Sequence, residues 1–313
     1  MSFKQFLIRL IAFILGVILV DQVSGIFIQY LYDHAGDKFE RETYMRRELN
    51  APVLMFGSSR CTHHYMPSVF SDSLSMPAYN CGQRGNGIIY TYGRLSTIFE
   101  RYTPKVVIID FIQVFDIEKN DNNRYLDYLK IDYGGHRAID SLFYDCDPSS
   151  KYKMLLKSYR YNSLICDLVL NTVLRNRGRF SKDGFMPLEG TYEIDGNYRL
   201  IKNTLKSIDP IKEKYIRKLA KEKRDGCNMF FVMSPTFNDP PSEEFIALIS
   251  SIAKENNIPF LDYSYDKQFL GHAELFSDEA HMNTTGAELF SKKLAHAIKE
   301  LIKEECVNNE YKE

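Results

Sequence analysis

The sequence Phe56-Gly57-Ser58-Ser59-Arg60 directly follows a short apolar run, Pro52-Val53-Leu54-Met55. An apolar run bounded by Pro on one side and by Gly-Ser on the other is typical of a buried strand that ends abruptly. Open α/β sheets form their binding sites at the carboxyl ends of their strands. The stretch therefore predicts that Ser59 is delivered to the site edge of a sheet, where its hydroxyl is a candidate nucleophile.

Apolar runs recur along the chain and alternate with helical patterns. Further strands are expected at residues 77–80, 105–110, 228–233 and 259–263. Helices are expected at 67–74, 88–102, 210–224, 242–256 and 286–303, the last capped by Thr284 or Thr285. Because strands that alternate with helices indicate βαβ units, the sequence predicts an α/β domain with a mostly parallel sheet.

Residues 117–203 interrupt this alternation and are rich in Asn, Asp, Tyr and Arg. We expect them to form an insertion over the carboxyl edge of the sheet, because long excursions inside a domain are usually lids or binding loops. Their tyrosines would either stack on a sugar or build a small satellite core. The predicted organisation is an anchor at 1–33, a helix or stalk at 34–50, and one domain at 51–313.

The first thirty residues indicate a membrane location. Residues 10–20 are uncharged and apolar, and apolar character resumes at 23–32, which is long enough to cross a bilayer core of about 30 Å. Lys4 and Arg9 precede this run, so the positive-inside rule predicts a single-pass protein of the cytoplasmic (inner) membrane with its domain on the extracytoplasmic, periplasmic side. The alternatives are a cleaved signal peptide, for which residues 23–25 make a poor cleavage site, and an amphipathic helix packed on the domain.

Composition excludes several kinds of partner. The 40 basic and 41 acidic residues nearly balance, and basic runs contain interleaved acids, so we expect no nucleic-acid partner. The six cysteines form no C-x-x-C pair and no zinc spacing, so no metal site and no cofactor are expected. Cys61 and Cys81 flank the predicted site, and a disulfide between them stays open.

A serine hydroxyl needs a neighbouring base, and a histidine base needs a carboxylate that fixes its tautomer. The segment Ser277-Asp278-Glu279-Ala280-His281 supplies both just before the last predicted helix. A turn between them would let the Asp278 carboxylate reach Nδ1 of His281 while Nε2 faces the site. We therefore predict Ser59 as nucleophile, His281 as base and Asp278 as its orienting group, with Ser58 as the alternative nucleophile.

The arrangement resembles the SGNH (GDSL-like) hydrolase superfamily, and within it the membrane-anchored, DltD-like proteins linked to cell-surface acyl transfer. Gly57-Ser58-Ser59 resembles the first sequence block of that family, Asn80 to Gly85 the second, and Asp278-x-x-His281 the fifth. The resemblance implies a three-layer sandwich with a flavodoxin-like sheet, and an oxyanion hole made by the backbone N–H groups of Ser59 and Gly85.

Two departures from the family pattern stand out. The first block lacks the Asp of the GDSL signature, and the Gly-x-Asn-Asp of the third block is absent after residue 110. Gln113 stands about where that Asn would be and is the candidate third oxyanion donor. Arg60 and Arg84 are candidate groups for holding an anionic substrate. His63 and His64 either contact substrate, support the site, merely pack or face solvent.

These features predict an extracytoplasmic serine acyl-ester hydrolase or O-acyltransferase. Its expected substrate is an acyl ester of a cell-envelope glycan or glycolipid, and a polytopic membrane O-acyltransferase is an expected partner. The alternatives are a binding or assembly module of a cell-surface polymer modification system that retains the fold with little or no turnover, and a cytoplasmic lipase-like enzyme.

Overall fold

The computed structural model of the chain describes residues 2–36, 38–121, 125–174, 182–194, 196 and 198–310. It divides into two compact units. Unit 1 comprises Met1–Glu48 and Asn122–Gly178, and unit 2 comprises Leu49–Asp121 and Arg179–Glu313. These boundaries differ from the single domain expected at 51–313, because residues 122–178 of the predicted insertion belong with the amino-terminal helices, whereas its two ends, 117–121 and 179–203, belong with the sheet.

Unit 2 is built on a five-stranded, all-parallel sheet. Its strands are β1 (Val53–Phe56), β2 (Ala78–Asn80), β3 (Val106–Asp110), β4 (Asn228–Met233) and β5 (Phe260–Asp262). They lie in the order β2-β1-β3-β4-β5, with Val53 beside both Ala78 and Val106. This is a doubly wound order, and it confirms the predicted α/β class with a parallel sheet.

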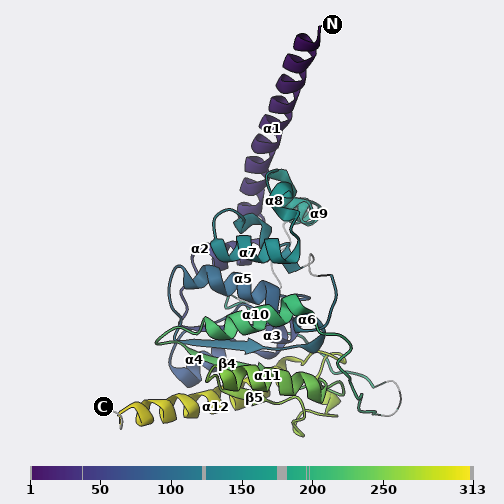
Figure 1. The fold of residues 1–313 in the computed structure, drawn as a ribbon. Helices are drawn as coiled ribbons and strands as arrows, with labels where there is room; N and C mark the ends of the chain where they lie inside the picture. The colour runs from purple at the N-terminus through teal and green to yellow at the C-terminus, as the bar shows by residue number, and fades with distance from the viewer. Residues whose placement is uncertain are drawn as a thin grey trace. The chain divides into compact units, whose positions relative to one another are not determined.

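Helices flank the sheet of unit 2 on both sides. They are α3 (Ser59–His64), α4 (Pro67–Leu74), α5 (Ile88–Phe99), α6 (Gln113–Asp116), α10 (Pro210–Lys221), α11 (Glu243–Glu255), η4 (Ala273–Leu275) and α12 (Thr284–Glu310). Figure 1 shows α5 and α10 on one side of the sheet and α4 and α12 on the other. Met55, Ile108 and Val232 point to the second side, where they share a buried core with Phe290 and Ile298 of α12.

The start of α12 differs from the expected one. Thr284 is the first residue of the helix, and Oδ1 of Asn283 accepts a hydrogen bond from the Gly286 N–H at 3.0 Å. Asn283 therefore satisfies one of the free N–H groups of the first turn, in place of the expected threonine cap.

Unit 1 contains α1 (Phe3–His34), α2 (Lys38–Arg47), η2 (Lys130–Asp132), α7 (Arg137–Cys146), α8 (Ser150–Lys153), η3 (Ser158–Tyr161) and α9 (Ile165–Leu174). α1 is long and apolar enough to cross a membrane, with a mean hydropathy of 2.3 in its most apolar window. Residues 3–20 are all exposed, and Asp21 is the first buried residue of α1.

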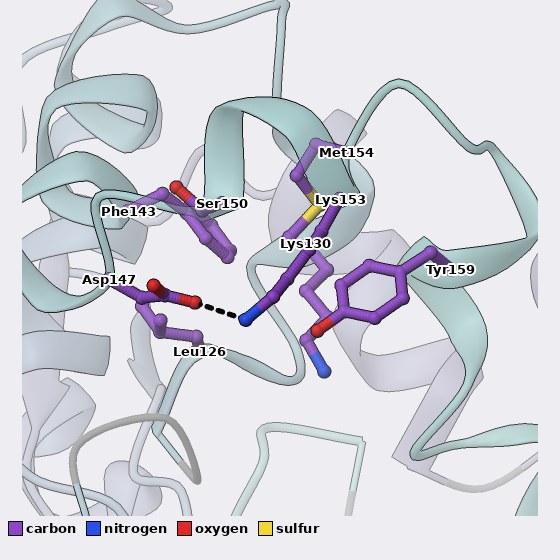
Figure 2. A pocket seen from close by; sticks show the side chains of 8 residues that line it. All are labelled: Leu126, Lys130, Phe143, Asp147, Ser150, Lys153, Met154 and Tyr159. Atoms are coloured by element: carbon purple, nitrogen blue, oxygen red, sulfur yellow. Dashed lines mark hydrogen bonds and ion pairs between the residues drawn. The ribbon is translucent and has the colours of Figure 1, made fainter.

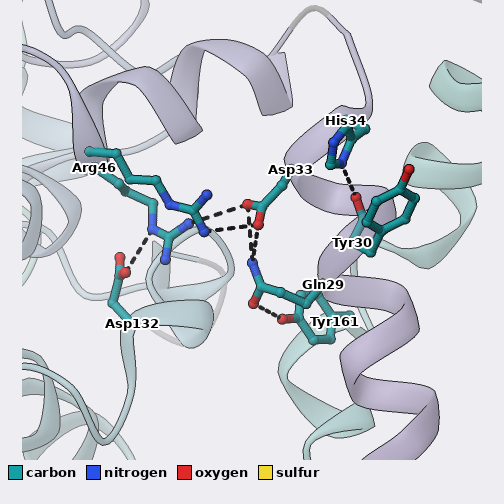
Figure 3. A network of polar contacts seen from close by, with 8 residues as sticks. Gln29, Tyr30, Asp33, His34, Arg46, Asp132 and Tyr161 are labelled. Atoms are coloured by element: carbon teal, nitrogen blue, oxygen red, sulfur yellow. Dashed lines mark hydrogen bonds and ion pairs between the residues drawn. The ribbon is translucent and has the colours of Figure 1, made fainter.

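The second half of α1 packs within unit 1. Tyr32 of α1 and Phe39 of α2 share a buried core with Tyr161, Leu164 and Leu168 from the predicted insertion. A polar network continues this contact (Figure 3): Asp33 pairs with Arg46 and Arg47, Arg46 also pairs with Asp132 at 2.7 Å, and the Tyr161 hydroxyl donates to Gln29. The second apolar run of the sequence, residues 23–32, is therefore partly a protein core.

Candidate active site

The turn after β1 determines where Ser59 lies. The strand ends at Phe56, and Gly57 adopts a positive φ of 156°. A Cβ at Gly57 would lie 2.9 Å from the carbonyl oxygen of Asp110, so the close approach of β3 requires glycine here. Ser59 follows as the first residue of α3, at the carboxyl end of β1.

A chain of hydrogen bonds joins Ser59, His281 and Asp278. Nε2 of His281 lies 2.9 Å from Oγ of Ser59, although 222 residues separate them in sequence. Nδ1 of His281 lies 2.9 Å from each carboxylate oxygen of Asp278. With the proton of the imidazole on Nδ1, the ring donates to Asp278 and accepts the Ser59 hydroxyl proton, which is the arrangement that activates a serine.

Local turn chemistry holds Asp278 in place. Its Oδ1 accepts hydrogen bonds from the backbone N–H groups of Ala280 and His281, each at 2.8 Å. Burial disfavours the ionised form of Asp278, but its hydrogen bonds with the ring and backbone of His281 and with Ala280 outweigh this and hold the pKa of the carboxyl below its usual value. The side chain thus orients His281 while remaining ionised.

Two further histidines on α3 contact the segment that carries His281. The backbone N–H of Met282 donates to Nε2 of His64 at 3.0 Å, and the His63 ring packs edge-on against the His281 ring with centroids 5.1 Å apart. Nδ1 of His63 also donates to the Met186 carbonyl at 2.7 Å. Burial lowers the pKa of His63 to about 4 and that of His64 well below its usual value, so both rings are neutral near pH 7.

The glycine-rich loop after β2 is hydrogen-bonded to the Ser59 turn. The Gln83 N–H donates to the Gly57 carbonyl at 2.9 Å, and Gly85 lies two residues further on with a positive φ of 68°. The backbone N–H groups of Ser59 and Gly85 donate to no other group in the described part of the chain. Neither N–H is thus engaged elsewhere among the residues described, and an oxyanion hole requires donors that are not already in use.

Asn80 connects this loop to α3. Its amide nitrogen donates to the carbonyls of Cys61 at 2.7 Å and Tyr65 at 2.8 Å, while its oxygen accepts from the Gly82 N–H at 2.9 Å. Asn80 is fully buried, so these bonds are shielded from water. Cys61 and Cys81 are both free thiols, so the disulfide left open by the sequence is absent from the structure.

Gln113 does not contribute an open amide to this group. Its Nε2 donates to Glu118 at 2.7 Å and to the Thr204 carbonyl at 3.1 Å, and its Oε1 accepts from the Ser242 N–H at 2.8 Å. Both amide hydrogens are thus in use. The structure gives Gln113 a bridging role among the loops, in place of the expected role as oxyanion donor.

The remaining predicted residues are Ser58, Arg60 and Arg84, which make fewer contacts in this part of the structure. Oγ of Ser58 is buried and has no hydrogen-bond partner among the residues described, so nothing there activates it as a nucleophile. Burial lowers the pKa of Arg60, although Asp110 and Asp239 lie near enough to oppose that shift. A guanidinium nitrogen of Arg84 donates to the sulfur of Met186 at 3.5 Å.

Asp110, at the end of β3, is a buried structural group. It accepts from the Tyr65 hydroxyl at 2.7 Å, and from the backbone N–H and hydroxyl of Ser234. Burial raises the pKa of Asp110 to about 6 despite these bonds and the nearby Arg60. Its hydrogen bonds join β3 to the end of β4 and to the residue that follows α3.

Sequence reasoning missed the contribution of Met186 and left the role of His64 open. Met186 comes from the end of the predicted insertion, where its N–H donates to the Thr62 carbonyl and its carbonyl accepts from His63. No local pattern marks such backbone contacts. His64 had a signal, since it follows Ser59 within two helical turns, but its partner Met282 lies far away in sequence.

A pocket of about 200 Å³ lies in unit 1 (Figure 2), and no predicted site residue lines it. Its two lysines are already paired, Lys153 with Asp147 and Lys130 with Asp127, each at 2.7 Å. The described residues also contain no group of three or more His, Cys, Asp or Glu side chains placed to hold a metal ion. The Ser59 group is therefore the strongest candidate site.

In comparisons with known proteins, the chain matches no family model and no curated protein.

Proposed function

We propose that this chain is a membrane-anchored serine acyl-ester hydrolase or O-acyltransferase. One observation carries the proposal: the Oγ of Ser59, the imidazole of His281 and the carboxylate of Asp278 form a continuous hydrogen-bonded chain with 2.9 Å contacts at both nitrogens. This combination supplies a nucleophile, a base and an orienting group at the carboxyl end of a parallel strand.

In the proposed reaction, Oγ of Ser59 attacks the acyl carbonyl and forms a C–O bond while Nε2 of His281 takes the hydroxyl proton. The tetrahedral intermediate collapses when the ester C–O bond breaks, and the protonated His281 returns that proton to the leaving alcohol. The acyl group then sits on Ser59. Water in a hydrolase, or a sugar hydroxyl in a transferase, attacks the acyl carbonyl while His281 takes its proton, and the acyl–Oγ bond breaks as His281 returns that proton to Ser59.

The free N–H groups of Ser59 and Gly85 are the proposed oxyanion donors. The engagement of Gln113 elsewhere leaves the hole with two donors from these residues instead of three. Removal of one such donor typically costs about 3–4 kcal/mol of transition-state stabilisation. We therefore expect slow turnover, which suits a transferase with a restricted acceptor.

The sequence resemblance to the SGNH superfamily and its DltD-like members remains part of the proposal, as does the substrate class, an acyl ester of a cell-envelope glycan or glycolipid. The apolar α1, with Lys4 and Arg9 ahead of its apolar run, supports a single-pass anchor with both units outside the cytoplasm. A polytopic O-acyltransferase would then deliver an acyl donor across the membrane, and Arg60 and Arg84 are available for an anionic group of the substrate.

A fluorophosphonate probe tests the nucleophile directly, because it reacts with activated serines. We expect the full-length chain to be labelled, Ser59→Ala to be unlabelled, and the matched control Ser58→Ala to be labelled. Mass spectrometry of the acyl-enzyme after incubation with an envelope extract would then identify the acyl group. A folded wild-type chain that resists the probe would contradict the proposal.

The engagement of the Gln113 amide and the missing third-block Asn favour a second candidate, a binding or assembly module with little turnover. The same experiment separates the two, since such a module would bind envelope glycan without forming an acyl-enzyme. A reporter fused after residue 313 tests the location, because a periplasmic reporter that stays inactive would indicate a cytoplasmic domain.

A further inference from the structure

We propose that unit 1 contacts the bilayer through a second surface besides α1. This apolar patch consists of Leu155, Leu156, Ile165, Val169, Leu170 and Val173. Its proposed partner is the interfacial region of the same lipid bilayer that α1 crosses. The inference rests on the proposed anchor and is independent of the proposed chemistry at Ser59.

The composition of α9 is the first step of the argument. The helix carries one charged residue, Asp167, in ten, and its Leu168 packs into the core with Tyr32 and Phe39. The opposite face presents Val169 and Val173, which are 48% and 73% exposed. A surface helix normally places polar residues on its outward face, so a continuous aliphatic face indicates a partner.

The second step locates the membrane surface along α1, next to the segment that carries Leu155 and Leu156. The Asp21 carboxylate accepts hydrogen bonds from the backbone N–H groups of Lys157 at 2.7 Å and Ser158 at 3.2 Å. Residues 3–20, ahead of Asp21, are all exposed and span about 27 Å at about 1.5 Å per residue, with the long side chains of Lys4 and Arg9 reaching back to the headgroups of the opposite interface. Because a bilayer core is about 30 Å thick, Asp21 lies where α1 leaves the hydrocarbon, and the residues bonded to it lie at the membrane surface.

The third step is continuity with the lipid-facing surface of α1. The helix keeps exposed apolar side chains just past Asp21, at Val23, Ile26 and Phe27. α9 contacts the second half of α1, where Leu168 and the preceding Leu164 pack into the same core as Tyr32, and Figure 1 shows α9 alongside that half of the helix. The exposed face of α9 thus extends an apolar surface that already requires lipid.

The residues that border the patch fit a bilayer interface better than a protein partner. Tyr152 is 66% exposed, and the Lys151 ammonium lies 4.9 Å from its ring centroid. Lys157 follows Leu155 and Leu156 directly. Tyrosines favour the headgroup level, and long lysine side chains reach polar headgroups while their stems cover apolar surface.

Tryptophan fluorescence tests the inference, because the chain contains no Trp and each substitution adds a single reporter. The full-length chain is reconstituted into phosphatidylcholine–phosphatidylglycerol vesicles whose acyl chains carry bromine either near the carbonyl or near the chain end. Leu155→Trp and Val173→Trp report on the patch, and Phe13→Trp reports on α1. Glu40→Trp is the control, since Glu40 is an exposed, charged residue of α2, which begins after α1 has ended.

We expect Leu155→Trp and Val173→Trp to emit at shorter wavelength than Glu40→Trp and to lose emission most with bromine near the carbonyl. Phe13→Trp should lose emission most with bromine near the chain end. If Phe13→Trp is quenched while both patch positions emit as in water, the inference is overturned and the patch faces water or a protein. If the patch positions are quenched and Phe13→Trp is not, the result contradicts the proposal that α1 spans the bilayer but supports the contact between the patch and lipid. Val169→Trp replaces a patch variant whose circular dichroism departs from wild type.

Discussion

The Met282 backbone N–H donates to Nε2 of His64 across 3.0 Å, and both residues are fully buried. Met282 directly follows His281, and His64 ends the short helix that Ser59 begins. One hydrogen bond therefore fixes the segment carrying the proposed base on the helix carrying the proposed nucleophile. His64 is a positioning residue, because it acts on His281 through the backbone.

Replacement of His64 tests this role. His64→Phe leaves the Met282 N–H buried without an acceptor, which costs about 1–3 kcal/mol and frees the His281 segment to move. We expect lower unfolding stability and roughly 10- to 100-fold slower fluorophosphonate labelling, because small displacements of a base are costly. The matched variant His64→Gln keeps an acceptor near the Nε2 position and should retain more of both properties. Equal labelling rates for Phe and Gln would rule out positioning through this bond.

Asp278→Asn tests the orienting carboxylate. An amide in this place cannot favour the tautomer with the proton on Nδ1 of His281, so Nε2 would no longer accept the Ser59 proton reliably. We expect labelling to slow by about 10²- to 10⁴-fold. The effect should be nearer the lower value if a water molecule accepts the Nδ1 hydrogen bond in place of the carboxylate. Ser59→Ala gives the background of the assay. Labelling of Asp278→Asn at the wild-type rate would show that His281 needs no orienting group.

Asn80→Asp tests the connection between α3 and the glycine-rich loop. An ionised carboxylate would face the carbonyls of Cys61 and Tyr65, which now accept from the amide, and an unpaired buried charge typically costs about 3–5 kcal/mol. We expect a lower unfolding temperature and slower labelling. The control is Asn86→Asp in the same loop, where the amide donates to a single carbonyl among the residues described, that of Arg84 at 3.1 Å, so the loss should be smaller. Equal losses in the two variants would contradict the role given to Asn80.

The strands of unit 2 were predictable because the local sequence pattern of each one is enough to indicate a buried strand. The run Val106-Val107-Ile108-Ile109 lies between a charged turn and a polar strand end, and the observed β3 differs from the expected strand by one residue. Parallel pairing followed from the alternation with helices. The start of α12 was less certain, since Asn283, Thr284 and Thr285 are all good caps, and only contacts with the folded loop select Asn283.

What the sequence could not predict depends on distant partners. The insertion divides between the two units because Lys157 and Ser158 bond to Asp21, more than a hundred residues away, whereas Met186 bonds to His63. Gln113 stands in the right place after β3, but its amide is taken by Glu118 and Ser242. Neither outcome leaves a periodic pattern or a short motif.

His63 makes the stability of the fold depend on pH in a direction that can be measured. Burial lowers its pKa to about 4, with the charges of His281 and Arg84 adding to the effect and the bond to Met186 opposing it. In the unfolded chain the pKa of histidine is about 6.5. Between these values the unfolded chain binds more protons, so acidification from pH 7 to 5 favours unfolding by about 2 kcal/mol through this residue.

The variant His63→Asn removes the titration and keeps a donor for the Met186 carbonyl near the Nδ1 position. Its free energy of unfolding should therefore fall by about 2 kcal/mol less than that of wild type between pH 7 and 5. Denaturant unfolding of the detergent-solubilised full chain, followed by circular dichroism, measures the difference. Other buried groups, such as His64 and Asp110, titrate in both proteins, so their contributions to the difference between the two proteins largely cancel. Parallel pH dependence of the two proteins would mean that His63 becomes protonated in the folded chain as readily as in the unfolded one.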